Sequence, residues 1–453
     1  MEKEIFSEID EHKEEYIEFL QEIIQTNSYN PPGNEQDVAE KIQKYFNTID
    51  IQNELFPLEH NRANLIASLT SDYSGETLLY TGHMDVVPPG EKDEWNYPPL
   101  SGHIKRNKYM YGRGTSDMKG ALVAMAIALQ VLNNMNLDTD KNLAFLAVSD
   151  EEVLGDIGTK WCIENVLEPR SIDCKFTIVG ECTGLPPLPK ALIVGEKGHI
   201  TVKLETHGIE CHSSIPFEGK NAIYMMSDII QNLNKLNNYI EDIPPPMTEK
   251  ELKDHLSKVF PNKEVFNRIF NEQPRLQNFV KALKTFTKNL NIIDGGVKDN
   301  VIPAKCKAIM DFRTFPGIDG KMILDGLTQV IKDHCNYQVK SKHKKKTDEI
   351  YVSLELGHER EASYWANWKK SVRLKELKSC IEKAYGETSF YSLFPGASDA
   401  ECFRNSGYCP QTVIFGPGIA PKAHAVDEYI EIEDFINAIK VYCLFGYNFL
   451  TSS

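Results

Sequence analysis

The feature that most restricts the fold is a set of short apolar runs, each bounded by polar turns. The clearest of them cover residues 64–69, 78–81 and 143–148. Continuous apolar runs of this length are typical of strands buried on both faces of a sheet. Helix patterns over residues 119–132 and 158–166 accompany them. Strands that alternate with helices predict an α/β sheet that is covered on both sides.

A different pattern begins at residue 200. Apolar and polar residues alternate over 200–206, as in a sheet with one face in water. The elements expected next are a helix over 221–236, strands near 287–293 and 305–313, a helix over 321–334, and strand candidates at 337–343 and 349–355. This order predicts an α+β unit of the split βαβ, ferredoxin-like type. The α/β pattern then returns, with helices over 368–385 and near 432–450 and a strand over 412–415.

The sequence therefore predicts two domains, one of them discontinuous. Residues 1–194 and 356–453 are expected to form an α/β domain with a mixed central sheet, and residues 195–355 an inserted α+β domain. Within the insert, residues 241–284 are predicted to hold an extra helical insertion of one or two short helices.

The charge of the chain argues against several partners. The chain has 50 Lys and Arg residues and 65 Asp and Glu residues, which gives a net charge of −15. A chain this acidic is a poor candidate for binding nucleic acid or an anionic membrane. Its first ten residues lack the apolar core of a signal peptide, and no apolar helix pattern reaches the ~20 residues that span a bilayer. Ten cysteines are too few for a disulfide scaffold, and no two have the C-x-x-C spacing of a thiolate zinc site or a thioredoxin-like motif. A reducing, cytoplasmic setting is therefore the expected one.

Side chains able to bind metal follow several of the apolar runs. His83 and Asp85 come at the end of one run, and such a pair suits a metal-binding imidazole held by a carboxylate, or else a surface loop. Asp117 directly precedes a helix, where it would bind a metal or serve as the helix N-cap. Three consecutive acids, residues 150–152, follow another run, and their repulsion calls for a cation or a shifted pKa unless the loop is solvated.

Two further side chains complete the pattern. Glu181 follows the apolar residues 178–180, and His424 follows a glycine-rich turn. Glu151 and Glu152 point in different directions, so one could bind a metal while the other moves protons. Two imidazoles and three carboxylates form the composition expected of a two-metal hydrolase. The candidate ligands are His83, Asp117, Glu152, Glu181 and His424.

At the level of motifs, the chain resembles the M20 metallopeptidase and deacylase family from about residue 15 to 445. That family includes acetylornithine deacetylase, succinyl-diaminopimelate desuccinylase, aminoacylase and carboxypeptidase G-type enzymes. The matching strings, in order, are GHMDVVPPG, YGRGTSDMKGA, SDEE, GECTG, GIECHSSIPFEGKNAI, FGPG and AHAVDEY.

The resemblance implies a centre of two divalent metal ions, zinc first and cobalt or manganese as alternatives. His83, Asp117 and Glu181 would hold one ion; Asp117, Glu152 and His424 would hold the other, with Asp117 bridging. Asp85 would orient His83. Glu151 would be the general base that takes a proton from the water between the metals.

The resemblance also implies roles for the inserted domain, as a lid and as the surface of a homodimer. His212 would reach the partner subunit's active site and stabilise the oxyanion. Asn300 and Arg313 would bind the substrate, and an ion pair with Asp311 is the structural alternative for Arg313.

By the same resemblance, the expected function is removal of an acyl group from an N-acyl amino acid, of the acetylornithine or succinyl-diaminopimelate type. A dipeptidase or carboxypeptidase acting on short peptides is the alternative, because it would share every catalytic residue. A relative that binds metal or peptide without turnover is disfavoured, since all five ligands and Glu151 are present. A thiol hydrolase using Cys211 and His212 is disfavoured too, since adjacent strand residues point to opposite faces.

Overall fold

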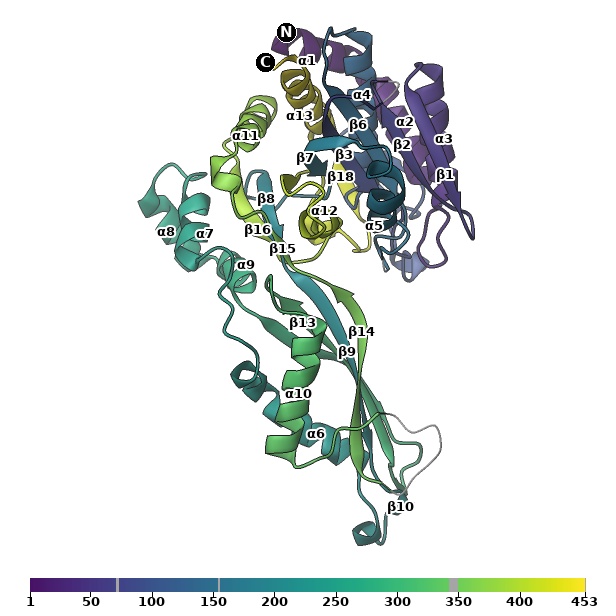
Figure 1. Cartoon of the computed structure of the whole chain (residues 1–453), viewed down its shortest axis with the longest axis vertical. Coiled ribbons are helices and arrows are strands. Elements are labelled where there is room, and N and C mark those ends of the chain that lie inside the picture. The colour runs from purple at the N-terminus through teal and green to yellow at the C-terminus, as the bar shows by residue number, and fades with distance from the viewer. Residues whose placement is uncertain (71–72, 154, 342–348, 453) are drawn as a thin grey trace.

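The computed structural model describes residues 1–70, 73–153, 155–341 and 349–452. Two parts follow one another along the long axis of the molecule (Figure 1). A large sheet surrounded by helices forms one part, and a smaller sheet carrying two helices forms the other. Both chain ends lie at the outer end of the first part (Figure 1).

The large sheet has nine strands in the order β1-β2-β6-β3-β7-β17-β8-β15, with β16 also paired to β8. Its central strands β6, β3, β7 and β17 are mutually parallel, whereas β1, β2 and β15 pair antiparallel. The mixed α/β sheet predicted from the apolar runs is therefore confirmed. The strands are β1 (Gln52–Leu58), β2 (Arg62–Ser68), β3 (Glu76–His83), β6 (Asn142–Val148), β7 (Asp173–Val179), β8 (Ala191–Glu196), β15 (Ser363–Tyr364), β16 (Phe390–Phe394) and β17 (Thr412–Ile414).

Helices cover both faces of this sheet. α4 is apolar on all sides and almost wholly buried, because it packs against β3 and β6 on one side and α2 and α13 on the other. The helices are α1 (Glu2–Glu11), α2 (Lys13–Gln25), α3 (Glu35–Thr48), α4 (Lys119–Asn134), α5 (Thr159–Cys162), α11 (Val372–Tyr385), α12 (Ala400–Asn405) and α13 (Ile432–Thr451). A small sheet of β4 (His103–Lys105), β5 (Tyr109–Tyr111) and β18 (Tyr429–Glu431) lies beside them.

The second part is an antiparallel sheet in the order β11-β13-β9-β14. Along the chain its elements run β-α-β-β-α-β, which confirms the predicted split βαβ unit. One face packs on two helices through Met310, Phe312 and Leu327, while polar residues alternate on the other face. The elements are β9 (Gly198–His207), α6 (Ala222–Asn232), β11 (Thr287–Gly295), β13 (Lys305–Thr314), α10 (Gly320–Cys335) and β14 (Tyr351–Arg360). A two-stranded ribbon joins β10 (Cys211–His212) to β12 (Val301–Ile302).

The chain passes between the two sheets twice. It leaves the large sheet at Glu196 and enters the small one at Gly198, and it returns between Arg360 and Ser363. The domain limits at residues 195 and 355 stay a prediction. The strand candidate at 337–343 is wrong where the structure describes it, since only an isolated bridge joins Val339 to Val352. Its residues 342 and 343 lie outside the described part.

The extra insertion holds three helices, α7 (Glu249–Ser257), α8 (Lys263–Glu272) and α9 (Pro274–Lys284). A capping box between Thr248 and Glu251 starts α7. Although these helices lie between strands of the small sheet in sequence, α7 packs against β16, α8 and α9 pack against α7 and each other, and apolar side chains of all three join the core of the large sheet. Figure 1 shows them beside β16. Within the described residues, no helix is both long and apolar enough to cross a membrane.

Candidate metal centre

Four parallel strands end at one edge of the large sheet, and four of the five candidate ligands follow those ends, whereas Asp117 lies between β5 and α4. β3 ends with His83 itself, paired in register with Val148, the last residue of β6. The loop after β6 carries Glu152, and the loop after β7 carries Glu181. The carboxyl ends of parallel strands are where ligand sites form in open α/β sheets.

The structure brings all five predicted ligands together in two groups of three that share Asp117. In each group, one ligand atom from every residue lies within 4.8 Å of the others. The first group is His83, Asp117 and Glu181, and the second is Asp117, Glu152 and His424. Residues up to 341 positions apart in the chain therefore meet at one point, at the sheet edge where the sequence predicted them.

Asp117 lies between the two histidines and directs one carboxylate oxygen to each. Its Oδ1 is 3.1 Å from Nε2 of His83, and its Oδ2 is 3.2 Å from Nε2 of His424. Glu181 Oε1 lies 3.4 Å from the His83 nitrogen, and Glu152 Oε2 lies 3.0 Å from the His424 nitrogen. The Asp117 carboxylate thus has the position of a group shared between two binding sites.

Asp85 holds three parts of the centre in place. Nδ1 of His83 lies 2.8 Å from the Asp85 carbonyl oxygen, which leaves Nε2 to face the cluster. The Asp85 carboxylate accepts the backbone N–H groups of Glu151 at 3.2 Å and Glu152 at 3.0 Å. The Asn30 side chain donates to the same carboxylate at 2.8 Å. One buried acid therefore orients a candidate ligand and fixes the backbone of the loop that carries two more candidate site residues, Glu151 and Glu152.

The loop after β6 also depends on Asp150, whose φ of 72° lies in the left-handed region that few non-glycine residues adopt. Arg62 pairs with the Asp150 carboxylate at 2.8 Å and with buried Glu35 at 2.6 Å. Asn30 donates to Asp150 at 3.4 Å. This network holds the strained turn directly before Glu151.

The acidic cluster strongly perturbs the protonation of its members. Burial and the charge of Asp117 raise the pKa of Glu152 to about 8 and raise the pKa of Glu181 well above its usual range. Hydrogen bonds with Asp117 and Glu152 raise the pKa of His424 to about 11. Buried carboxylates that repel one another are stabilised by a bound cation. The imidazole and carboxylate donors, without thiolates, fit zinc, cobalt or manganese.

Glu151 lies beside the cluster without belonging to either group of three. Its Oε2 is 3.9 Å from Nε2 of His83, and its Oε1 accepts a hydrogen bond from Nη1 of Arg360. Arg360 also donates to Oδ1 of Asp399 at 3.3 Å. The sequence reasoning missed Arg360, because it comes 209 residues after its carboxylate partner and belongs to no motif.

Glu428 is a second residue whose role the sequence reasoning missed. Its Oε1 accepts the backbone N–H groups of Gly114, Ser116 and Asp117 at 2.9–3.1 Å, and its Oε2 pairs with Arg113 at 2.6 Å. Arg113 in turn donates to the His424 carbonyl at 3.2 Å. The available signal was its place within the AHAVDEY string, four residues after His424.

The three residues predicted for the inserted domain do not reach this cluster. His212 is exposed on β10, at the end of the small sheet far from the large one (Figure 1), and its Nδ1 lies 2.7 Å from Oγ of Ser214. Arg313 pairs with Asp311 at 3.1 Å, as the structural alternative predicted. The side-chain Oδ1 of Asn300 is buried without a hydrogen-bond partner. The roles of these three residues stay predictions.

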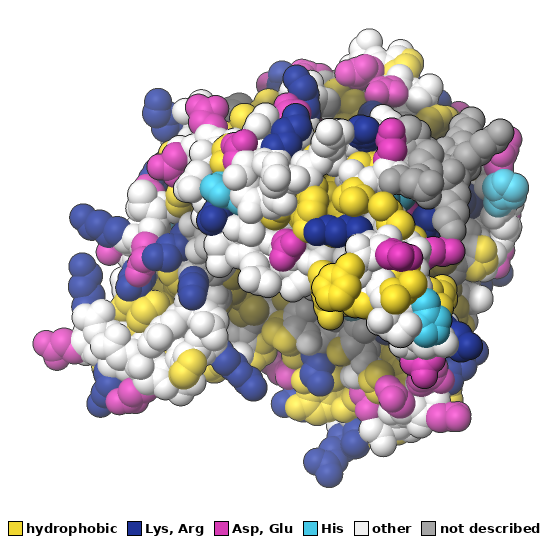
Figure 2. Space-filling model, turned by 90° about the horizontal axis from the view of Figure 1, so that it is seen from below, with side chains coloured by type: hydrophobic (Ala, Val, Ile, Leu, Met, Phe, Trp, Pro, Cys, Tyr) yellow, Lys and Arg dark blue, Asp and Glu magenta, His cyan; other side chains and the backbone are white. Residues whose placement is uncertain are grey.

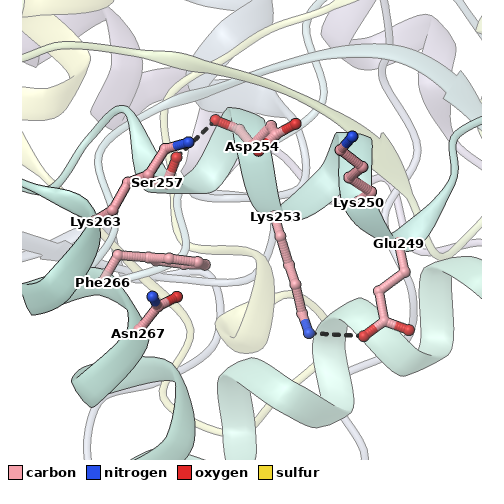
Figure 3. Close-up of a pocket in the computed structure, with 8 residues that line it drawn as sticks. All are labelled: Glu249, Lys250, Lys253, Asp254, Ser257, Lys263, Phe266 and Asn267. Atoms are coloured by element: carbon pink, nitrogen blue, oxygen red, sulfur yellow. Dashed lines mark hydrogen bonds and ion pairs between the residues drawn. The ribbon is translucent and has the colours of Figure 1, made fainter.

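A hollow of about 500 Å3 lies on the helical insertion, between α7 and α8 (Figure 3). Lysines and acids alternate around it, and Lys253 pairs with Glu249 at 2.7 Å. None of its lining residues belongs to the metal centre or contacts Glu151.

Several known proteins are similar to this chain in sequence. The sequence profile described as "Peptidase family M20/M25/M40" matches residues 79–448. A probable succinyl-diaminopimelate desuccinylase of Staphylococcus aureus (strain MSSA476) is 28% identical over 432 residues, covering 95% of this chain and 96% of that protein. The succinyl-diaminopimelate desuccinylase of Hydrogenovibrio crunogenus is 25% identical over 94% of this chain and 97% of its own length.

Two solved structures have a similar fold. The M20 family metallo-carboxypeptidase Sso-CP2 of Sulfolobus solfataricus superposes with a TM-score of 0.74 at 21% identity, covering 95% of this chain and 98% of its own. The dipeptidase Dug1p of Saccharomyces cerevisiae gives 0.76 at 16% identity, covering 100% and 99%. At these identities the likeness concerns the fold.

Proposed function

Since this chain belongs to peptidase family M20/M25/M40 and is a metal-dependent hydrolase of amide bonds, we propose that it removes the acyl group from an N-acyl amino acid. The observation that carries the proposal is the position of Asp117 between two groups of ligands, with Glu151 beside them. The similarity to desuccinylases over 95% of the chain favours an N-succinyl or N-acetyl amino acid as substrate.

We propose that His83, Asp117 and Glu181 hold one divalent ion and that Asp117, Glu152 and His424 hold a second. Bound there, the ions would lower the pKa of a water molecule and polarise the scissile carbonyl. Zinc is the first choice, because imidazole and carboxylate ligands suit it, and cobalt or manganese suit the same donors.

Glu151 is the proposed general base. Its Oε2 faces the cluster, so it is placed to take a proton from the attacking water and to deliver it to the leaving nitrogen. Asp85 keeps Nε2 of His83 turned toward the cluster and holds the Glu151 backbone through its N–H group. In this proposal Asp85 orients His83 and the Glu151 backbone, and Glu151 transfers the proton.

We further propose that the protein acts as a homodimer through the inserted part. His212 makes no hydrogen bond or ion pair with the metal centre, so it would reach an active site only in a second copy. Edge strand β11 exposes Ile292 and Ile293, and α6 exposes Tyr224. Figure 2 shows hydrophobic side chains on the end of the molecule that carries the small sheet. Asn300 and Arg313 are the proposed substrate-binding residues of this part.

A cytoplasmic location is proposed with this function. All ten cysteines are free thiols, which fits a reducing compartment.

The test is a set of hydrolysis assays on N-succinyl and N-acetyl amino acids and on dipeptides, with zinc, cobalt and manganese each supplied. Turnover of the acyl amino acids is expected, and a chelator is expected to abolish it. Turnover of dipeptides alone would replace the deacylase proposal by a peptidase. Glu151→Gln is expected to keep its metal and to lose at least 100-fold in kcat, the usual scale of general-base catalysis. Full turnover by this variant would remove Glu151 from the mechanism.

A further inference from the structure

Arg360 stands at the point where the chain returns from the small sheet to the large one. It is the last residue of β14, opposite His199 of β9 in register, and β15 begins three residues later. The residue is only 6% exposed. A buried arginine keeps its charge and needs anionic partners.

Its two anionic partners come from different loops of the large part. Nη1 donates to Oε1 of Glu151, and Nη2 donates to Oδ1 of Asp399 at 3.3 Å. The other oxygen of Glu151 is the one that faces His83. The guanidinium thus holds one oxygen of the carboxylate and leaves the second free toward the metal centre.

Glu151 needs such a partner because its surroundings repel it. The carboxylates of Asp117, Glu152 and Glu181 all lie in the adjoining cluster, and like charges disfavour one another. A glutamate side chain also has several rotamers of similar energy in the absence of a partner. Asp85 fixes only the backbone of Glu151. Among the described residues, the only side chain whose hydrogen bond fixes the Glu151 carboxylate is that of Arg360.

Gly155 makes room for this contact. A Cβ atom at that position would lie 2.6 Å from Nη2 of Arg360, closer than any ordinary contact. Its φ of 73° lies in the left-handed region, and its N–H donates to the Asp150 carbonyl at 2.7 Å. Glu151 and Gly155, from the same loop, therefore both lie against the guanidinium.

We propose that Arg360 is a positioning residue for the reaction: it fixes the Glu151 carboxylate so that one oxygen faces the metal centre, and it brings the end of an inserted-part strand into the active site of the same chain. This inference rests on the proposed role of Glu151 as the base. The small sheet then contributes to catalysis within one subunit, in addition to any role across a dimer.

The test compares Arg360→Gln and Arg360→Lys with the unchanged enzyme by kcat, KM, zinc content and thermal midpoint, on the substrate that the assays identify. A misplaced catalytic group costs on the order of 100-fold in rate, so Arg360→Gln is expected to lose about that factor in kcat, with KM within about threefold and the metal retained. Arg360→Lys is expected to recover part of kcat. In a Glu151→Gln background, Arg360→Gln is expected to cause no further loss, because both changes remove the same contribution.

Arg404 provides the matched control. It is equally buried and pairs with Glu196 at 3.3 Å, without contacting Glu151. Arg404→Lys is expected to lower the thermal midpoint and to keep kcat within about threefold. Asp399→Asn removes the charge of the second partner of Arg360, and it is expected to lower kcat by about tenfold. This variant tests the positioning role of Arg360 if Arg360→Gln fails to fold.

The two proposals fail in distinguishable ways. Wild-type kcat in the folded Arg360→Gln variant, or in Asp399→Asn where that variant does not fold, overturns the positioning role while the loss in Glu151→Gln stands. A kcat loss that multiplies with that of Glu151→Gln also overturns it. Activity retained by Glu151→Gln itself would instead overturn the proposed function.

Discussion

At the scale of single residues, Glu428 links two loops that carry candidate ligands. It accepts three backbone N–H groups from the segment before α4, including that of Asp117, and it pairs with Arg113, which donates to the His424 carbonyl. Glu428 is wholly buried and Arg113 is 2% exposed. A change at Glu428 should therefore alter the positions of both Asp117 and His424.

Glu428→Gln tests this link. The change leaves the Arg113 guanidinium buried without a negative partner, which costs about 3–5 kcal/mol of unfolding free energy when a buried ion pair is broken. Zinc affinity is expected to fall as well, because the ligand loops lose a shared anchor. Urea denaturation and metal titration measure the two effects. Glu433→Gln, at an exposed residue nearby, is the control, and equal stability of the two variants would contradict the expectation.

The meeting of the five candidate ligands could be predicted from the sequence, and the two buried residues that support them could not. His83, Glu152 and Glu181 each follow an apolar run, so the parallel-strand rule places them together. Arg360 contacts a partner 209 residues away in the sequence, and Glu428 contacts partners more than 300 residues away. A local sequence pattern cannot predict contacts between residues so far apart in the chain. Only the fold reveals them.

At the scale of elements, α7 to α9 show how a segment can belong to one sheet in sequence and to another in space. Their amphipathic pattern predicts that one face is buried, but it does not identify the partner. The partner of α7 is β16, more than a hundred residues further along the chain, and α8 and α9 pack on α7 and on each other. The helices themselves were predicted, as one or two instead of three.

His255 of α7 is expected to make the stability of the protein depend on pH. Its ring lies 5.4 Å from that of Trp368 and 5.7 Å from that of Tyr391, measured between centroids. Burial, with the charges of Lys258 and Lys369, lowers the pKa of His255 to about 4. An unfolded histidine has a pKa near 6.5. As the pH falls from about 6.5 to about 4, the unfolded state binds the proton first, so the protein loses stability in that window.

His255→Gln removes this titration. The thermal midpoint of the unchanged protein is expected to fall between pH 7 and pH 5 by a few degrees more than that of the variant. Parallel thermal melts at the two pH values measure the difference. Identical pH dependence in the two proteins would show that the ring is not buried in its neutral form.

At the scale of the whole molecule, the distance between His212 and the metal centre makes a prediction about assembly. The ribbon that carries His212 lies at the far end of the small sheet (Figure 1). If this residue acts in a second copy, a mixture of His212→Ala and Glu151→Gln subunits should contain heterodimers with one complete site.

The mixing experiment predicts a definite recovery of activity. Each variant alone is expected to be nearly inactive, and subunits mixed in equal amounts after exchange are expected to regain about a quarter of wild-type activity, since half of the random dimers carry one working site. The same samples can be sized by gel filtration. No recovery from a mixture that is shown to be dimeric would place His212 outside the partner's active site.

The two crossings between the sheets have a consequence for how this chain could be shortened. Because His199 and Arg360 are cross-strand partners, the two ends of the small part are neighbours, and a short linker could join them after deletion of everything between. Such a truncation would still uncover β16, which loses its contact with α7, and it would remove the rest of β14, the strand that holds Arg360 beside the Glu151 carboxylate. The two ends of the segment are easily joined, but the large part depends on contacts that the segment makes. A minimal version of this hydrolase would therefore have to keep α7 to α9 and the strand that positions Arg360.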